Sequence, residues 1–190
     1  TADFALAIPS IVFGAAGTAG QRCTSTRRVI VHESRYEQLA AELTSVFKQI
    51  KIGDPLSPQT LMGPLIDQAA VDQYCKAIAQ IKKSNAKILY GGEVIERPGH
   101  FVEPTLVYAT PDLEIVQEET FAPILYVFPF CTLRDAIAHN NNVSQGLSSS
   151  LFTGALQSAE LFLSVSGSDC GIANINVGTS GAEIGGAFGG

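Results

Sequence analysis

A thiol beside a guanidinium, directly after a run of small residues, is the arrangement in this sequence best suited to chemistry. Cys23 follows Gln21 and Arg22, and residues 13–20 contain only Phe, Gly, Ala and Thr. The thiolate is the nucleophilic form of cysteine, and a neighbouring positive charge favours it. Small residues let a substrate approach the backbone closely. The pattern predicts a nucleophile at Cys23, and the alternative is an inert buried thiol.

A second candidate segment is Glu-Thr-Phe-Ala-Pro at residues 119–123, preceded by Glu118. A carboxylate can accept hydrogen bonds from both hydroxyls of a vicinal diol, which is the chemistry that Glu119 could contribute. The alternative is a solvated acidic turn, and we keep that interpretation for Glu118. Because Glu119 is far from Cys23 in the sequence, only the fold can bring the two together.

The third candidate segment is the glycine-rich run at residues 176–190. Residues with little or no side chain expose backbone N–H groups, and consecutive N–H groups can bind an anion. This predicts an anion-binding turn at Ser180, Gly181 and Ala182. A generic glycine-rich turn is the alternative.

Together these segments resemble the aldehyde dehydrogenase superfamily. Residues 17–24, Gly-Thr-Ala-Gly-Gln-Arg-Cys-Thr, resemble its nucleophile loop, and residues 119–123 resemble its Glu-x-Phe-x-Pro element. Residues 176–190 resemble the substrate-anchor loop of the antiquitin branch, the α-aminoadipic semialdehyde dehydrogenases. The order and spacing also match, and the resemblance extends from residue 1 to residue 190.

The resemblance implies a chemistry for the thiol segment. The Cys23 thiolate would attack an aldehyde carbon, the thiohemiacetal would pass hydride to the nicotinamide of NAD or NADP, and water would hydrolyse the resulting thioester to an acid. The oxyanion needs preorganised donors, one of which would be the Cys23 backbone N–H. Glu119 would bind the ribose next to the nicotinamide, and Phe121 would pack near the ring.

The resemblance also implies a substrate with a carboxylate, such as α-aminoadipic semialdehyde. Ser180, Gly181 and Ala182 would hold its distal carboxylate, and simple aldehydes remain an alternative. Arg22 has two candidate roles, lowering the pKa of Cys23 or pairing with this carboxylate. The antiquitin resemblance favours pairing, and a solvated surface arginine is the alternative.

Alternating strand and helix patterns predict an α/β fold with a largely parallel sheet flanked by helices. The expected strands lie at residues 26–33, 86–90, 101–108, 123–130, 147–152 and 170–175. The expected helices lie at about 2–16, 34–50, 67–81, 132–142 and 155–165.

Polar residues before these helices predict where they begin. Ser34, with Glu37 three positions on, and Thr132, with Asp135 three positions on, fit the capping-box pattern. Asp67 is a candidate cap for the helix between them.

The remaining cysteines, histidines and arginines of interest are expected to be structural or exposed. Cys75 lies on an apolar helical face and is expected in the core. Two adjacent arginines should point to opposite faces of a strand, which predicts structural or surface roles for both. The residues given these structural or surface roles are Cys131, Cys170, His32, His100, His139, Arg27 and Arg28.

Composition narrows the class of protein. Hydrophobic residues make up 46% of the chain and charged residues 16%, enough apolar material for a core. The net charge of −6 without a basic cluster argues against nucleic acid as partner, and no apolar run reaches the roughly 20 residues that span a bilayer.

The four cysteines form no Cys-x-x-Cys pair and no histidine stands at ligand spacing, so no metal site is expected. Free thiols are typical of a reducing compartment, which favours the cytoplasm, with mitochondria as the alternative in a eukaryote.

Residues 1–190 are expected to form one catalytic domain of a larger, homo-oligomeric enzyme. Family members carry the cofactor-binding domain, the general base and the oligomerisation strand in other segments. We therefore expect the purified 190-residue chain to show no aldehyde oxidation with NAD. Robust NAD reduction by this chain alone, measured by absorbance, would contradict that expectation.

Two rival functions remain. A cysteine hydrolase that uses Gln21, Cys23 and one histidine would need a histidine ring nitrogen within about 3–4 Å of the Cys23 sulfur. A non-catalytic structural or interaction module of the same fold would bury that sulfur away from any cleft.

Overall fold

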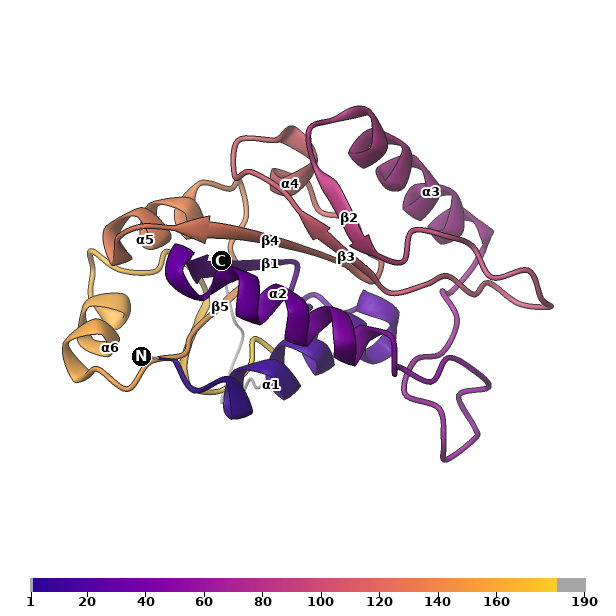
Figure 1. Ribbon diagram of the computed structural model, residues 1–190, viewed down its shortest axis with the longest axis horizontal. Helices are drawn as coiled ribbons and strands as arrows, with labels where there is room; N and C mark the ends of the chain where they lie inside the picture. Colours follow the sequence, from indigo (N-terminus) through magenta and orange to yellow (C-terminus); the bar gives the residue numbers. More distant parts are fainter. Residues whose placement is uncertain (1, 181–190) are drawn as a thin grey trace.

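A four-stranded, mainly parallel sheet forms the centre of the computed structural model, which describes residues 2–180 (Figure 1). The strand order is β1-β4-β3-β2, where β4 pairs in parallel with β1 and β3, and β2 is antiparallel to β3. The strands are β1 (Arg28–His32), β2 (Lys87–Tyr90), β3 (Thr105–Tyr108) and β4 (Ile124–Phe130). The predicted fold class is confirmed.

The central strand β4 has apolar side chains on both faces, because successive residues of a strand point to opposite sides. Leu125 and Val127 pack against helices α1 (Phe4–Ala16) and α2 (Glu33–Phe47). Ile124, Tyr126 and Phe128 pack on the other side with α3 (Gln68–Lys83). Figure 1 shows the resulting three layers, with α2 and α3 on opposite sides of the sheet.

Two predicted strands form a sheet of their own. β5 (Ser148–Leu151) pairs in parallel with β6 (Ile172–Ile175), and helix α6 (Leu156–Leu163) connects them. The remaining elements are the 3₁₀ turn η1 (Gly17–Gly20) and the helices α4 (Glu114–Gln117) and α5 (Leu133–Asn141). The predicted strand pattern was therefore correct, although the six strands do not make one continuous sheet among the described residues.

The helix caps confirm two predictions and correct a third. Asp67 accepts a hydrogen bond from the Ala70 N–H at 2.9 Å, and Thr132 and Asp135 make the expected reciprocal capping box. The predicted capping box at Ser34 is wrong, because α2 begins at Glu33. The imidazole of the preceding His32 accepts from the Ser34 N–H at 3.2 Å and takes the place of a hydroxyl cap.

The predicted core position of Cys75 is also wrong, since its side chain is exposed. The buried stripe of α3 runs through Val71, Tyr74, Ile78 and Ile81. Cys75 lies one residue past Tyr74, and a helix turns by about 100° per residue, which carries the thiol beyond the edge of this stripe.

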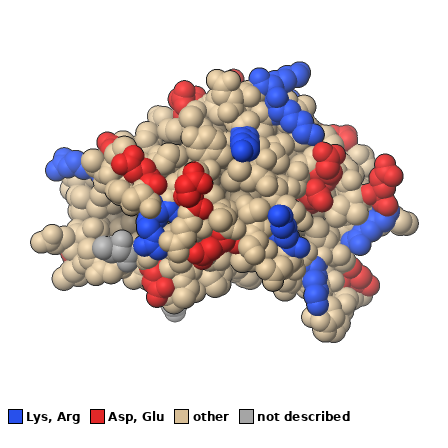
Figure 2. Space-filling model, viewed as in Figure 1, with Lys and Arg blue, Asp and Glu red and all other residues tan. Residues whose placement is uncertain are grey.

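Acidic and basic side chains are mixed on the face shown in Figure 2, where they do not separate into blocks of one sign. Within residues 2–180, no helix is both long enough and apolar enough to cross a bilayer. The expectation that neither nucleic acid nor membrane is a partner stays a prediction.

Candidate active site

The thiol follows a tight left-handed turn. After α1 ends at Ala16, three successive residues have positive φ: Thr18 at 54°, Ala19 at 54° and Gly20 at 68°. Non-glycine residues in this region cost about 1–3 kcal/mol each, and such strain is typical of functional sites. The turn reverses the chain and delivers Cys23 to the surface, where its side chain is exposed.

Contacts on both sides hold this turn in place. The Thr26 N–H donates to the Gly14 carbonyl of α1 at 3.0 Å. The Gln21 side-chain oxygen accepts from the Ile66 N–H at 2.9 Å, which ties the turn to the loop before α3. We refer to residues 17–26 as the thiol loop. The sequence did not predict this role for Gln21, because no pattern linked it to residue 66.

Cys23 lies on the wall of a cavity of about 1020 Å³. The same cavity is lined by Glu119 from the segment before β4 and by Thr179 from the segment after β6. The fold thus brings the three candidate segments to one cavity, although each comes from a different part of the chain. An exposed thiol on a cavity wall argues against the inert buried cysteine.

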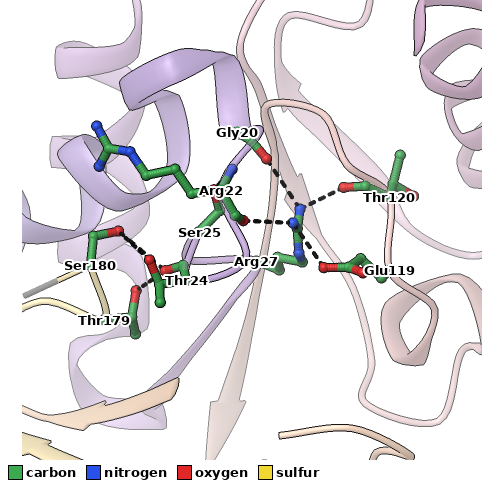
Figure 3. A network of polar contacts seen from close by, with 9 residues as sticks. All are labelled: Gly20, Arg22, Thr24, Ser25, Arg27, Glu119, Thr120, Thr179 and Ser180. Carbon is green, nitrogen blue, oxygen red and sulfur yellow. Dashed lines mark hydrogen bonds and ion pairs between the residues drawn. The ribbon is translucent and has the colours of Figure 1, made fainter. Parts of the chain in front are cut away.

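The segment after β6 packs directly on the thiol loop (Figure 3). The hydroxyls of Thr179 and Ser180 donate to the carbonyl of Thr24 at 2.8 and 3.2 Å. The Thr179 hydroxyl also lies 2.7 Å from that of Thr26. Ser180 therefore contacts the residue that follows Cys23, and its role in binding an anion stays a prediction. The predicted partners Gly181 and Ala182 lie outside the described residues.

Strand β5 supports this segment through its serines. The Ser148 hydroxyl donates to the Thr179 carbonyl at 2.7 Å, and that of Ser150 donates to the Val177 carbonyl. The Asn174 side chain donates to the Gly178 carbonyl at 3.0 Å. These bonds fix the backbone just before Ser180.

Arg22 turns its side chain toward α1. Its guanidinium carbon lies 4.5 Å from the centre of the exposed Phe13 ring, a cation–π geometry. In Figure 3 this guanidinium points away from Arg27 and extends on the same side of the thiol loop as Ser180. The position suits an approach to a ligand anion near residue 180.

Glu119 and Phe121 lie on the other side of the thiol loop. Glu119 forms a 3.0 Å ion pair with Arg27, yet its side chain remains 59% exposed. The Phe121 ring is 38% exposed and lies 5.0 Å from the Arg27 guanidinium. The Glu119 carboxylate is thus accessible on the cavity wall with an aromatic ring two residues on, and the cofactor roles of both residues stay predictions.

The sequence did not place Arg27 in the site, but the structure does. Its guanidinium donates to the carbonyls of Thr120 at 2.6 Å, Arg22 at 3.2 Å and Gly20 at 3.5 Å (Figure 3). Burial lowers the pKa of Arg27 from its ordinary value, and the charges of Glu119 and Cys23 partly oppose this.

Arg28 points the other way, as expected for neighbours at the start of a strand. Its guanidinium donates to the carbonyls of His139 and Asn140 in α5, each at 2.9 Å. Burial also lowers the pKa of Arg28. The predicted structural role suits Arg28, whose guanidinium ties β1 to α5.

The cysteine-hydrolase alternative gains no support from the described histidines. The His32 ring contacts Ser34 and Phe130, and the His139 ring contacts Phe128. Across residues 2–180, no hydrogen bond joins a histidine ring to the Cys23 sulfur.

No group of three or more His, Cys, Asp or Glu side chains in the same range is arranged to hold a metal ion.

Comparisons with known proteins identify the family of this chain. The family model described as "Aldehyde dehydrogenase family" matches residues 1–190. The chain is 52% identical over 189 residues to "Aldehyde dehydrogenase family 7 member A1" of Pisum sativum, and 50% identical over 190 residues to "Alpha-aminoadipic semialdehyde dehydrogenase" of Mus musculus. Both matches cover 100% of this chain, but only 37% of the pea protein and 35% of the mouse protein.

A solved structure shares the fold. The crystal structure of betaine aldehyde dehydrogenase from Staphylococcus aureus in complex with NAD+ is 30% identical, with a TM-score of 0.88. The match covers 93% of this chain and 36% of that chain. With the family model matched over its whole length and the thiol exposed on the cavity wall, this chain belongs to the aldehyde dehydrogenase family.

Proposed function

We propose that this chain is the thiol-bearing catalytic domain of an NAD(P)-dependent aldehyde dehydrogenase that oxidises a carboxylate-bearing aldehyde. The observation that carries the proposal is the packing of Thr179 and Ser180 on Thr24, next to the exposed thiol of Cys23. The proposed anion-binding turn thus follows directly after Thr179, which lines the same cavity as Cys23.

Cys23 is the proposed nucleophile. Its thiolate attacks the aldehyde carbon, the carbon–sulfur bond forms, and the carbonyl oxygen becomes an oxyanion. Among the described residues, no hydrogen bond occupies the backbone N–H of Cys23, so this group is available to stabilise the oxyanion. Bound NAD supplies the hydride acceptor, and Glu119 and Phe121 are the residues that would hold its ribose and nicotinamide.

Arg22 and the turn at Ser180, Gly181 and Ala182 are the proposed anchor for the distal carboxylate. Arg22 and Ser180 lie on the same side of the thiol loop (Figure 3). A guanidinium pairs strongly with a carboxylate, and a backbone turn of small residues adds N–H donors. The name of the mouse relative, about 50% identical, supports α-aminoadipic semialdehyde as the substrate to test first.

Substitution of Arg22 by alanine is expected to weaken selection for charged aldehydes. In the full-length protein, kcat/KM for α-aminoadipic semialdehyde should fall about 10- to 100-fold further than kcat/KM for an uncharged aldehyde of similar length, because a charge-assisted pair is worth about 1.5–3 kcal/mol. The measurement is steady-state NADH formation across both substrate classes.

The matched control is Arg97→Ala, because Arg97 also stacks on a phenylalanine, with its guanidinium carbon 3.6 Å from the Phe101 ring centre. This variant should leave the ratio of the two kcat/KM values unchanged. Equal losses on both substrates in the Arg22 variant would contradict a carboxylate-binding role.

A further inference from the structure

We propose that Arg27 is a positioning residue that couples the nucleotide-binding carboxylate of Glu119 to the thiol loop. The inference rests on the proposed function, because it concerns how that site holds its nucleotide and its nucleophile together. It assigns a role in the reaction to a residue for which the sequence predicted only a structural or surface position.

One guanidinium connects two segments that lie far apart in the sequence. Arg27 donates to the carbonyls of Gly20 and Arg22, which bracket Gln21 just before Cys23. It also donates to the Thr120 carbonyl and pairs with the Glu119 carboxylate, 92 positions away in the chain. Because the guanidinium is planar and rigid, its donors fix the relative positions of all these acceptors.

The pair with Glu119 is built asymmetrically. The Arg27 side chain is 17% exposed, whereas that of Glu119 is 59% exposed. A purely structural buried pair would shield both partners from solvent. Here the cation is largely buried, while the carboxylate lines the cavity and its Oε1 is held 3.0 Å from the Arg27 guanidinium. Arg27 therefore orients Glu119 and leaves it accessible to a diol.

Phe121 belongs to the same unit, because its ring lies 5.0 Å from the Arg27 guanidinium. Loss of the guanidinium would release Glu119, Phe121 and the thiol loop from one another. The expected consequence is a combined effect, in which the KM for NAD rises and kcat falls.

The test compares Arg27→Met with Arg28→Met in the full-length protein. The two arginines are adjacent and each donates to backbone carbonyls. Arg28 donates to carbonyls of α5, whereas Arg27 donates to the Thr120 carbonyl in the candidate site. We expect Arg27→Met to raise the KM for NAD and lower kcat, each by about 10-fold or more, from the loss of charge-assisted bonds. Arg28→Met should change both constants by less than about 3-fold, even where the two variants lose similar thermal stability.

Two further variants keep the test informative if Arg27→Met folds poorly. Arg27→Lys retains the charge but not the planar set of donors, so the KM for NAD should be partly restored while kcat stays low. Glu119→Gln should cost less in the Arg27→Lys background than in the wild type, because the two residues act together.

Equal kinetic effects of Arg27→Met and Arg28→Met, or additive effects of the Lys and Gln substitutions, would overturn the positioning role while leaving the proposed function intact. A wild-type protein that does not oxidise aldehydes with NAD would instead overturn the proposed function. In that case NAD binding, measured by calorimetry on the same variants, still decides whether Arg27 orients Glu119: weaker binding for Arg27→Met alone supports the role, and equal binding refutes it.

Discussion

Substitution of Cys23 by alanine is expected to reduce aldehyde oxidation by the full-length protein by about 10³-fold or more. The Cys23 thiol is exposed on the cavity wall, in the loop on which Thr179 packs, whereas Cys131 and Cys170, which line the same cavity, belong to other segments. Removal of a covalent nucleophile takes away the intermediate that divides the reaction into two easier steps. The measurement is kcat for NADH formation at saturating aldehyde and NAD.

The matched control is Cys75→Ala. Cys75 is also an exposed free thiol, but it lies on α3, on the far side of the sheet from α2 (Figure 1). Its loss should change kcat by less than about 3-fold, since surface substitutions away from a site have small effects. Comparable losses from both substitutions would remove the reason for assigning the chemistry to Cys23.

Substitution of Gly20 by alanine adds a single methyl group and is expected to be the most damaging change of this size in the site. Gly20 has φ of 68°, and a Cβ there would lie 2.4 Å from the Ala122 carbonyl oxygen and 2.8 Å from the Pro123 nitrogen. Both neighbours are backbone atoms, so no side chain can rotate to make room. The left-handed φ and the steric clash together should cost about 3 kcal/mol or more in the free energy of unfolding.

The Gly20 substitution should also lower activity, because Ala122 belongs to the segment that carries Glu119 and Phe121. The added methyl group would push this segment away from the thiol loop. Gly17→Ala is the control, since its φ is −57° and its nearest neighbour is a flexible guanidinium nitrogen of Arg22 at 3.4 Å. Urea unfolding and kcat should both be near wild type for Gly17→Ala, and a Gly20 variant of equal stability and activity would refute the close approach.

The sequence predicted most of the sheet and the helices because their signals are local. Strand β4 is an uninterrupted apolar run, and the capping box of α5 is visible in the spacing of Thr132 and Asp135. The prediction failed at α2, because the sequence pattern favoured a hydroxyl cap while an imidazole from β1 took that place. It failed at Cys75, because the residues at the edge of the buried stripe depend on how α3 is rotated about its own axis against the sheet.

The candidate site could be predicted only in part, for a related reason. Resemblance of motifs identified Cys23, Glu119 and Ser180, and the structure brings them to one cavity or into contact with its wall. Arg27 and Gln21 carried no such signal, because their partners are backbone groups distant in the sequence. The alternation of side chains along β1 decides which of Arg27 and Arg28 faces the thiol loop. Two adjacent arginines in the sequence do not reveal which of them that is.

The most direct test of the nucleophile is to trap the covalent intermediate. The full-length protein is mixed with NAD and α-aminoadipic semialdehyde, quenched in acid within one turnover, digested with trypsin and examined by mass spectrometry. Cleavage after Arg22 and Arg27 isolates residues 23–27 as the peptide Cys-Thr-Ser-Thr-Arg. We predict that the mass of the acyl group appears on this peptide and disappears as the thioester is hydrolysed. An acyl group on the peptide of Cys75, Cys131 or Cys170, with turnover intact, would contradict the assignment of Cys23.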